Sequence, residues 1–198
     1  MPVPVGRLVV CLMLGALLAN CTKPAPASEA PLAGSAIGGP FELTDGHGKT
    51  VRWSDFAGRY RVVYFGYTYC PDVCPTDVAR MSQGLTKFEH AHPALGAEVQ
   101  PIFISVDPQR DTPQVVGEFT ANFHPRLIGL TGTPQQVKQA ANAFKVFYER
   151  GEKAPGGGYM VNHSTVTYLF GKNGEPLATL PTDLGPDAVA AELARWVT

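Results

Sequence analysis

The sequence VVYFGYTYCPDVCP, residues 62–75, gives the clearest indication of how the chain folds. Val62 to Tyr67 is β-branched or aromatic without polar alternation, which is typical of a strand buried on both faces. Apolar residues then recur at helical spacing from Val78 to Phe88, and Pro75 stands where a helix tolerates proline, in its first turn. The stretch predicts a buried strand that leads into a helix, with Cys70 and Cys74 at the junction.

Outward from this stretch, strands and helices alternate. The turn Asp45-Gly46-His47-Gly48 predicts a β-hairpin between 41–44 and 50–53, and Val99 to Val106 predicts a second buried strand. Thr112-Pro113 and Thr133-Pro134 each combine a hydroxyl cap with a proline and so predict two helix starts. Further strands are expected at 127–130, 166–170 and 177–180, and a final helix over Val189 to Val197. The order predicts an α/β sandwich whose mixed central sheet is flanked by helices.

Composition excludes several classes of protein. The 198 residues carry 17 acidic and 16 basic side chains, for a net charge of −1. Such a chain lacks the basic excess with which a nucleic-acid binder displaces phosphate counterions. A hydrophobic content of 44% with so small a net charge also argues against disorder.

The amino terminus, residues 1–21, is interpreted as an export signal. Arg7 precedes an apolar run, Leu8 to Ala19, which is too short for a spanning helix, although an uncleaved helix is the alternative. Its end resembles the lipobox of bacterial lipoproteins, which implies lipidation of Cys21; Asn20 departs from the small residue of that pattern. Residues 22–39, rich in alanine, proline and glycine, are expected to form a flexible linker, and residues 40–198 the domain.

The close cysteine pair is the main candidate for chemistry. Cys70 and Cys74 lie at a predicted helix start, where free N–H groups and the helix dipole favour the thiolate of both. Thiolates bind soft metals and exchange disulfides, and three intervening residues leave room for an ion. A simple staple or two inert thiols are the alternatives; a staple that closes so short a loop gains little chain entropy.

A metal on two thiolates needs a further donor, and the chain has five histidines. Four are interpreted as surface residues in turns or near helix ends: His47, His90, His92 and His124. His163 stands just before the strand 166–170, which we expect opposite the turn that holds Cys70. A lone histidine is more often structural or solvated, so the residues alone leave its role open.

Three ordered motifs identify a family resemblance. Phe65 to Pro75 (FGYTYCPDVCP), Ser105 to Pro113 (SVDPQRDTP) and Val161 to Ser164 (VNHS) resemble the Sco/SenC family, over a match from about Phe41 to Val197. The resemblance implies a thioredoxin-like, membrane-tethered copper protein that helps to assemble the binuclear copper centre of cytochrome c oxidase. It further implies that Cys70, Cys74 and His163 are the metal ligands. Tyr69 stands where many members have a histidine that is not one of the three ligands.

The resemblance also sets expectations about cargo and place. Two thiolates and one imidazole suit Cu(I), and can hold Cu(II) with a weaker extra donor, although zinc accepts the same set. We expect a metallochaperone on the periplasmic face of a bacterial membrane that delivers copper to the copper-bearing subunit of the oxidase, controlled by dithiol redox change. Another copper chaperone is a candidate donor. The glycines 156–158 suggest a loop that lets His163 swing, as a hypothesis.

Other functions use the same cysteines. A thiol-disulfide oxidoreductase would use Cys70 as nucleophile and Cys74 as resolving thiol. Against it, three residues rather than two separate the cysteines, and residues 160–165 lack the proline that thioredoxins carry opposite the pair. In peroxiredoxins a threonine stands three residues before the reactive cysteine, whereas Thr68 stands two before Cys70. A purely structural module leaves the motif unexplained.

Overall fold

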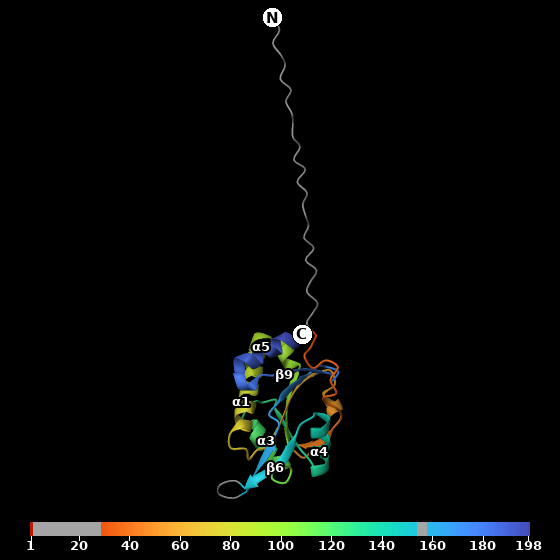
Figure 1. The fold of residues 1–198 in the computed structure, drawn as a ribbon, viewed down its shortest axis with the longest axis vertical. Helices are drawn as coiled ribbons and strands as arrows, with labels where there is room; N and C mark the ends of the chain where they lie inside the picture. The colour runs from red at the N-terminus through yellow and green to blue at the C-terminus, as the bar shows by residue number, and fades with distance from the viewer. Residues whose placement is uncertain (2–28, 154–157) are drawn as a thin grey trace.

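The computed structural model describes Met1 and residues 29–153 and 158–198 (Figure 1). Residues 2–21 of the predicted export signal, with Cys11 and Cys21, residues 22–28 of the predicted linker, and residues 156 and 157 of the predicted glycine loop 156–158 lie outside them. Of the helices within the described residues, none is both long and apolar enough to cross a membrane.

A seven-stranded sheet forms the centre, in the order β2-β1-β5-β4-β3-β8-β9. Its strands are β1 Glu42–Asp45, β2 Thr50–Arg52, β3 Tyr60–Gly66, β4 Val99–Ser105, β5 Ile128–Thr131, β8 Thr167–Phe170 and β9 Pro176–Leu180. The central strands β3, β4 and β5 run parallel, whereas β1 pairs antiparallel with β5, and β8 with β3. The predicted mixed sheet and amino-terminal hairpin are confirmed.

Helices cover both faces of this sheet: α1 Val73–Ala91, α2 Pro93–Ala97, α3 Pro113–Ala121, α4 Pro134–Ala143 and α5 Pro186–Trp196. Figure 1 shows α1, α3 and α5 on one face and α4 on the other. The two predicted caps are present, because the Thr112 and Thr133 hydroxyls accept the N–H groups of Val115 and Gln136 at 3.4 and 3.3 Å.

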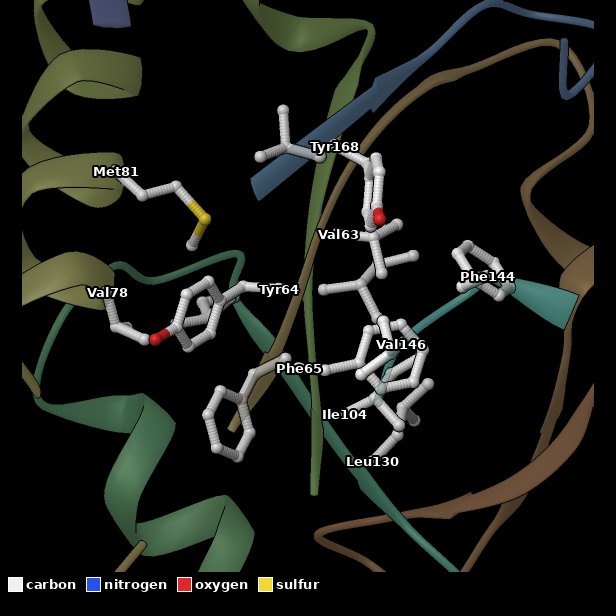
Figure 2. Packing of buried hydrophobic residues seen from close by; sticks show 14 of the residues in the cluster. Val63, Tyr64, Phe65, Val78, Met81, Ile104, Leu130, Phe144, Val146 and Tyr168 are labelled. Carbon is white, nitrogen blue, oxygen red and sulfur yellow. The ribbon is translucent and has the colours of Figure 1, made fainter. Parts of the chain in front are cut away.

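Packing on both faces explains the unbroken apolar run in β3. Tyr64 lies toward Val78 and Met81 of α1 (Figure 2). The next residue, Phe65, points to the opposite face, where its ring centroid lies 5.3 Å from that of Phe144. Every residue of β3 is buried. The strand therefore presents a fixed, buried end from which the turn to α1 departs.

Two features differ from the sequence-based expectation. Strands β6 Tyr148–Lys153 and β7 Tyr159–His163 form a separate two-stranded sheet, at the end of the molecule shown lowest in Figure 1. In β6, YERGEK, most side chains are exposed, so it lacks the apolar pattern by which strands are recognised. Part of the predicted linker also contacts the domain: Leu32 and Ile37 pack on the core, and the Gly38 N–H donates to the Ala143 carbonyl at 2.9 Å.

Candidate metal centre

The three residues singled out from the sequence come together at one end of β3. Cys70 lies in the turn after β3, Cys74 is the second residue of α1, and His163 ends β7. The Cys74 Sγ lies 3.1 Å from the His163 Nε2. The Cys74 backbone N–H donates to the Cys70 Sγ at 3.4 Å. Two soft sulfur donors and one imidazole therefore converge from three separate segments of the chain.

Asp111 holds the turn that carries Cys70. This aspartate is fully buried, and it accepts the Thr68 N–H at 3.0 Å, the Thr68 hydroxyl at 2.6 Å and the Ser105 hydroxyl at 2.5 Å. Burial raises the pKa of its carboxyl, an effect that these hydrogen bonds oppose. The second motif, 105–113, thus fixes the first motif in space.

Gly66 leaves the space that Cys74 occupies. A Cβ at this position would lie 3.1 Å from the Cys74 Sγ, 2.8 Å from a ring carbon of Tyr64 and 3.1 Å from one of Phe103. These separations are shorter than ordinary van der Waals contact. The missing side chain of this glycine at the end of β3 therefore makes room for the sulfur of Cys74, a residue that is 0% exposed.

A backbone carbonyl orients the imidazole of His163. Its Nδ1 lies 2.9 Å from the Ser164 carbonyl oxygen, which can only accept, so the network assigns the hydrogen to Nδ1. In the neutral ring, Nε2 then faces Cys74 with its lone pair. The rings of Tyr64 and Tyr67 meet the imidazole edge-on, with centroids 6.3 and 5.8 Å away. A carbonyl on the far ring nitrogen is a common support of metal-binding histidines.

The two cysteines differ in their protonation. A hydrogen bond from Cys74 lowers the pKa of Cys70 to about 3, against the effect of burial and with further help from backbone N–H groups. The same hydrogen bond, together with burial, raises the pKa of Cys74. The prediction that the helix start favours both thiolates is therefore wrong for Cys74. Its single proton faces two acceptors, the Cys70 sulfur and the His163 Nε2, and the sulfur is too deeply buried to carry its own charge easily.

A surface hollow of about 320 Å³ opens onto this site. Cys70 and His163 line it, together with Tyr67, Pro71, Asp72, Val73, Met160, Val161, Asn162 and Thr165. Cys70 is 9% exposed, so an ion that enters the hollow meets Cys70 and His163 before Cys74. A larger hollow of about 780 Å³ lies beside α3 and contains no cysteine.

The remaining histidines lie elsewhere. His47, His90 and His92 are exposed, as predicted. His124 is 4% exposed, and its Nε2 lies 3.3 Å from a carboxylate oxygen of Glu89, so the prediction of a surface residue is wrong there. In the sequence, His124 simply follows the end of a predicted helix, which does not indicate burial. The burial results from the packing of Glu89 on α1 against the loop before β5.

A cluster of tyrosines around one arginine adjoins the site. Arg110 lies over the rings of Tyr67, Tyr69 and Tyr159, with its central guanidinium carbon 5.6, 5.1 and 3.7 Å from the ring centroids. The Tyr67 hydroxyl lies 3.8 Å from the Met160 sulfur. Only the unpredicted strand β7 brings Tyr159 and Met160 here, so sequence spacing carried no indication of them.

Comparison with known proteins gives a consistent result. A family model described as SCO1/SenC matches residues 29–198. The SCO2-like protein of Rickettsia felis is 37% identical over 197 residues, covering 92% of this chain and 91% of that protein. The mitochondrial protein SCO1 homolog 1 of Arabidopsis thaliana is 44% identical over 143 residues, 72% of this chain but 42% of the relative, so the chain spans less than half of that relative's length.

A solved structure is similar over the same region. Arabidopsis thaliana ScoI with copper bound superposes with a TM-score of 0.75 at 37% identity, covering 81% of this chain and 97% of that one.

Proposed function

The chain belongs to the SCO1/SenC family and has its thioredoxin-like fold, and from this premise we propose that it is a copper-binding metallochaperone. Its ligands are Cys70, Cys74 and His163, and its cargo is Cu(I) or Cu(II). It delivers copper to the copper-bearing subunit of cytochrome c oxidase. Another copper chaperone supplies the metal.

The observation that carries this proposal is the 3.1 Å approach of the Cys74 sulfur to the His163 Nε2, beside the Cys70 sulfur. Two thiolates and an imidazole are the donors that copper prefers. With zinc bond lengths as a guide, a trigonal ion holds sulfur and nitrogen about 3.7 Å apart. Binding therefore needs a shift of about half an ångström, and the metal displaces the proton of Cys74. A solved relative at 37% identity holds copper.

We also propose that the chain works at a membrane. Residues 1–21 direct export to the periplasmic face of a bacterial membrane, where the lipid on Cys21 or an uncleaved helix tethers the domain. Leu32, within the predicted linker 22–39, already packs on the core. This tether keeps the copper site close to a membrane-bound oxidase.

The asymmetry of the cysteines favours a second candidate, a thiol-disulfide oxidoreductase that keeps oxidase cysteines reduced. The Cys70 thiolate attacks a partner disulfide, forms a mixed disulfide and releases one partner thiolate. Cys74 then gives its proton to the released partner thiolate and attacks the Cys70 sulfur, which closes the intramolecular disulfide and releases the second thiolate. The partner gains two electrons and the pair loses two. Copper leaves when the pair is oxidised, because disulfide sulfurs no longer donate as thiolates.

A Cu(I) titration tests the metal site. The full-length protein with Cys11→Ser and Cys21→Ser, reduced and in competition with a Cu(I) chelator, should bind one equivalent. Cys70→Ala, Cys74→Ala and His163→Ala should each bind at least about tenfold more weakly. His47→Ala, which removes an exposed histidine far from the cysteines in sequence, is the matched control and should bind as the parent does. Unchanged binding by His163→Ala would contradict the three-ligand site.

Two assays separate the candidate functions. The copper-loaded protein should transfer its metal to the copper-free, soluble copper domain of the oxidase subunit. The copper-free protein should reduce insulin slowly, if at all, under dithiothreitol. Rapid insulin reduction without copper transfer would instead support the oxidoreductase.

A further inference from the structure

We propose that Arg110 is a positioning residue that fixes His163 against the cysteine pair, through the rings of Tyr159 and Tyr67. The proposal rests on the copper function above and deepens it. His163 lies on β7, and among the described strands β7 pairs only with β6, outside the seven-stranded sheet. Backbone pairing therefore does not fix the direction of this hairpin relative to the cysteines.

The base of the hairpin is held by the chain itself. Tyr148 pairs with His163, the Ser164 N–H donates to the Phe147 carbonyl at 3.0 Å, and Val146 is buried in the core. Val161, in the middle of β7, also packs in the core. A second attachment, at the outer end of the hairpin, sets its remaining tilt and with it the direction of the imidazole.

Arg110 and Asp107 supply that second attachment at Tyr159, the first residue of β7. The guanidinium carbon of Arg110 lies 3.7 Å from the centroid of the Tyr159 ring. The Tyr159 hydroxyl donates to Asp107 at 2.6 Å, and Asp107, 1% exposed, also pairs with the Arg110 guanidinium. Both residues belong to the loop between β4 and α3, which is part of the main body of the domain.

Arg110 also contacts the segment that carries Cys70. It lies over Tyr69 and Tyr67, at 5.1 and 5.6 Å, and the Tyr67 ring in turn meets the imidazole of His163. One guanidinium thus touches the segments of a sulfur ligand and of the nitrogen ligand. Its Nη2 is buried without a hydrogen-bond partner among the described residues, an unfavourable placement that the packing against these rings explains.

Arg150 offers a matched control. Its guanidinium carbon lies 3.9 Å from the centroid of the same Tyr159 ring, nearly the distance of Arg110. Arg150 belongs to β6, however, so it joins two strands of the hairpin and does not attach the hairpin to the body. Arg110→Gln and Arg150→Gln each remove one positive charge from the face of the Tyr159 ring. Only Arg110→Gln also removes contacts between the hairpin and the body of the domain, although the hydrogen bond from Tyr159 to Asp107 remains.

In the full-length Cys11→Ser and Cys21→Ser background, Arg110→Gln should weaken Cu(I) binding about 10- to 100-fold, the range typical of outer residues that orient metal ligands. Arg150→Gln should stay within about threefold of the parent. The nitrogen contribution in copper X-ray absorption should fall only in Arg110→Gln. Equal losses in the two variants, or none in Arg110→Gln, would overturn the proposal.

A copper-independent measurement separates this inference from the proposed function. Hydrogen exchange of the β7 amides should accelerate in Arg110→Gln but not in Arg150→Gln, with β3 amides unchanged in both. A parent that binds no copper would refute the function, and unchanged β7 exchange in Arg110→Gln would refute the attachment.

If Arg110→Gln does not fold, Tyr159→Leu removes the same contact from the other partner. Tyr159 is only half-buried, and its replacement should accelerate β7 exchange to the same extent. Where both variants fold, the loss of copper affinity in the double variant should be smaller than the product of the two single losses, because both variants remove the contact between Arg110 and Tyr159. Multiplicative losses would show that the two residues act separately.

Discussion

Replacing Gly66 by alanine should disturb the metal centre, because the new methyl group would displace the Cys74 sulfur. The added methyl carbon would lie 3.1 Å from that sulfur and within 2.8 and 3.1 Å of carbons in Tyr64 and Phe103. Ordinary carbon contacts lie at about 3.5–4.0 Å, so at least one neighbour must move by about half an ångström. Tyr64, Phe103 and Cys74 are all fully buried, which leaves little room for that movement.

The magnitude follows from two opposing effects. Overpacking of a dense core costs about 1–3 kcal/mol. Alanine restricts the unfolded chain more than glycine does, which returns about 0.4–1 kcal/mol. We therefore expect Gly66→Ala to lower the free energy of unfolding by about 1–2 kcal/mol and the Tm by about 2–8 °C. Copper affinity should fall as well, by about tenfold, because the sulfur is displaced relative to His163.

Urea unfolding of the reduced protein, with the slope unchanged, measures the loss of stability. Cys74→Ala provides the control, since it removes the sulfur that the new methyl group meets. In the Cys74→Ala background, Gly66→Ala should lower the free energy of unfolding by at least about 0.5 kcal/mol less than it does in the parent. The reasoning is refuted if Gly66→Ala leaves the urea midpoint where it was, or if its effect is equally large with and without the sulfur.

Three further predictions concern protonation and the turn that holds Cys70. Copper binding at about pH 7.5 should release close to one proton from the cysteine pair, because the pKa of Cys70 is lowered and that of Cys74 is raised. Proton release is measured in weakly buffered solution, and release of two protons would contradict the difference between the two cysteines. Alkylation of Cys70 should proceed at a nearly constant rate from about pH 5 to 8, since its pKa of about 3 lies below that range, whereas a tenfold rise per pH unit would indicate an ordinary thiol. Asp111→Ala should destabilise the domain by about 2–4 kcal/mol, because it leaves the buried partners on Thr68 and Ser105 unpaired, and a Tm within about 1 °C of the parent would contradict the assigned role of the aspartate.

Much of the fold could be predicted because local patterns agree with tertiary packing. Val62 to Tyr67 is apolar throughout because both faces of β3 are covered, and the two Thr-Pro caps stand where α3 and α4 begin. The β6–β7 hairpin could not be predicted. Its contacts with the rest of the domain include side chains such as Arg110 on Tyr159, which lie about fifty positions apart in the sequence, and β6 is too polar to show a strand period.

The ligands of the candidate site could be predicted from the sequence, but their protonation could not. The cysteine spacing and the family motifs indicated Cys70, Cys74 and His163, and the structure brings these residues together. Proximity to a helix start could not reveal that Cys74 is fully buried and donates its proton to Cys70. That asymmetry arises from the hydrogen bond between the two sulfurs and from the burial of Cys74, which only the three-dimensional packing shows.

Copper X-ray absorption of the reduced, Cu(I)-loaded protein, with Cys11→Ser and Cys21→Ser, tests the three-ligand site most directly. The site predicts two sulfur neighbours and one nitrogen neighbour, with the nitrogen lost in His163→Ala and one sulfur lost in Cys74→Ala. Coordination by sulfur alone in the parent, or a nitrogen signal that persists in His163→Ala, would contradict it.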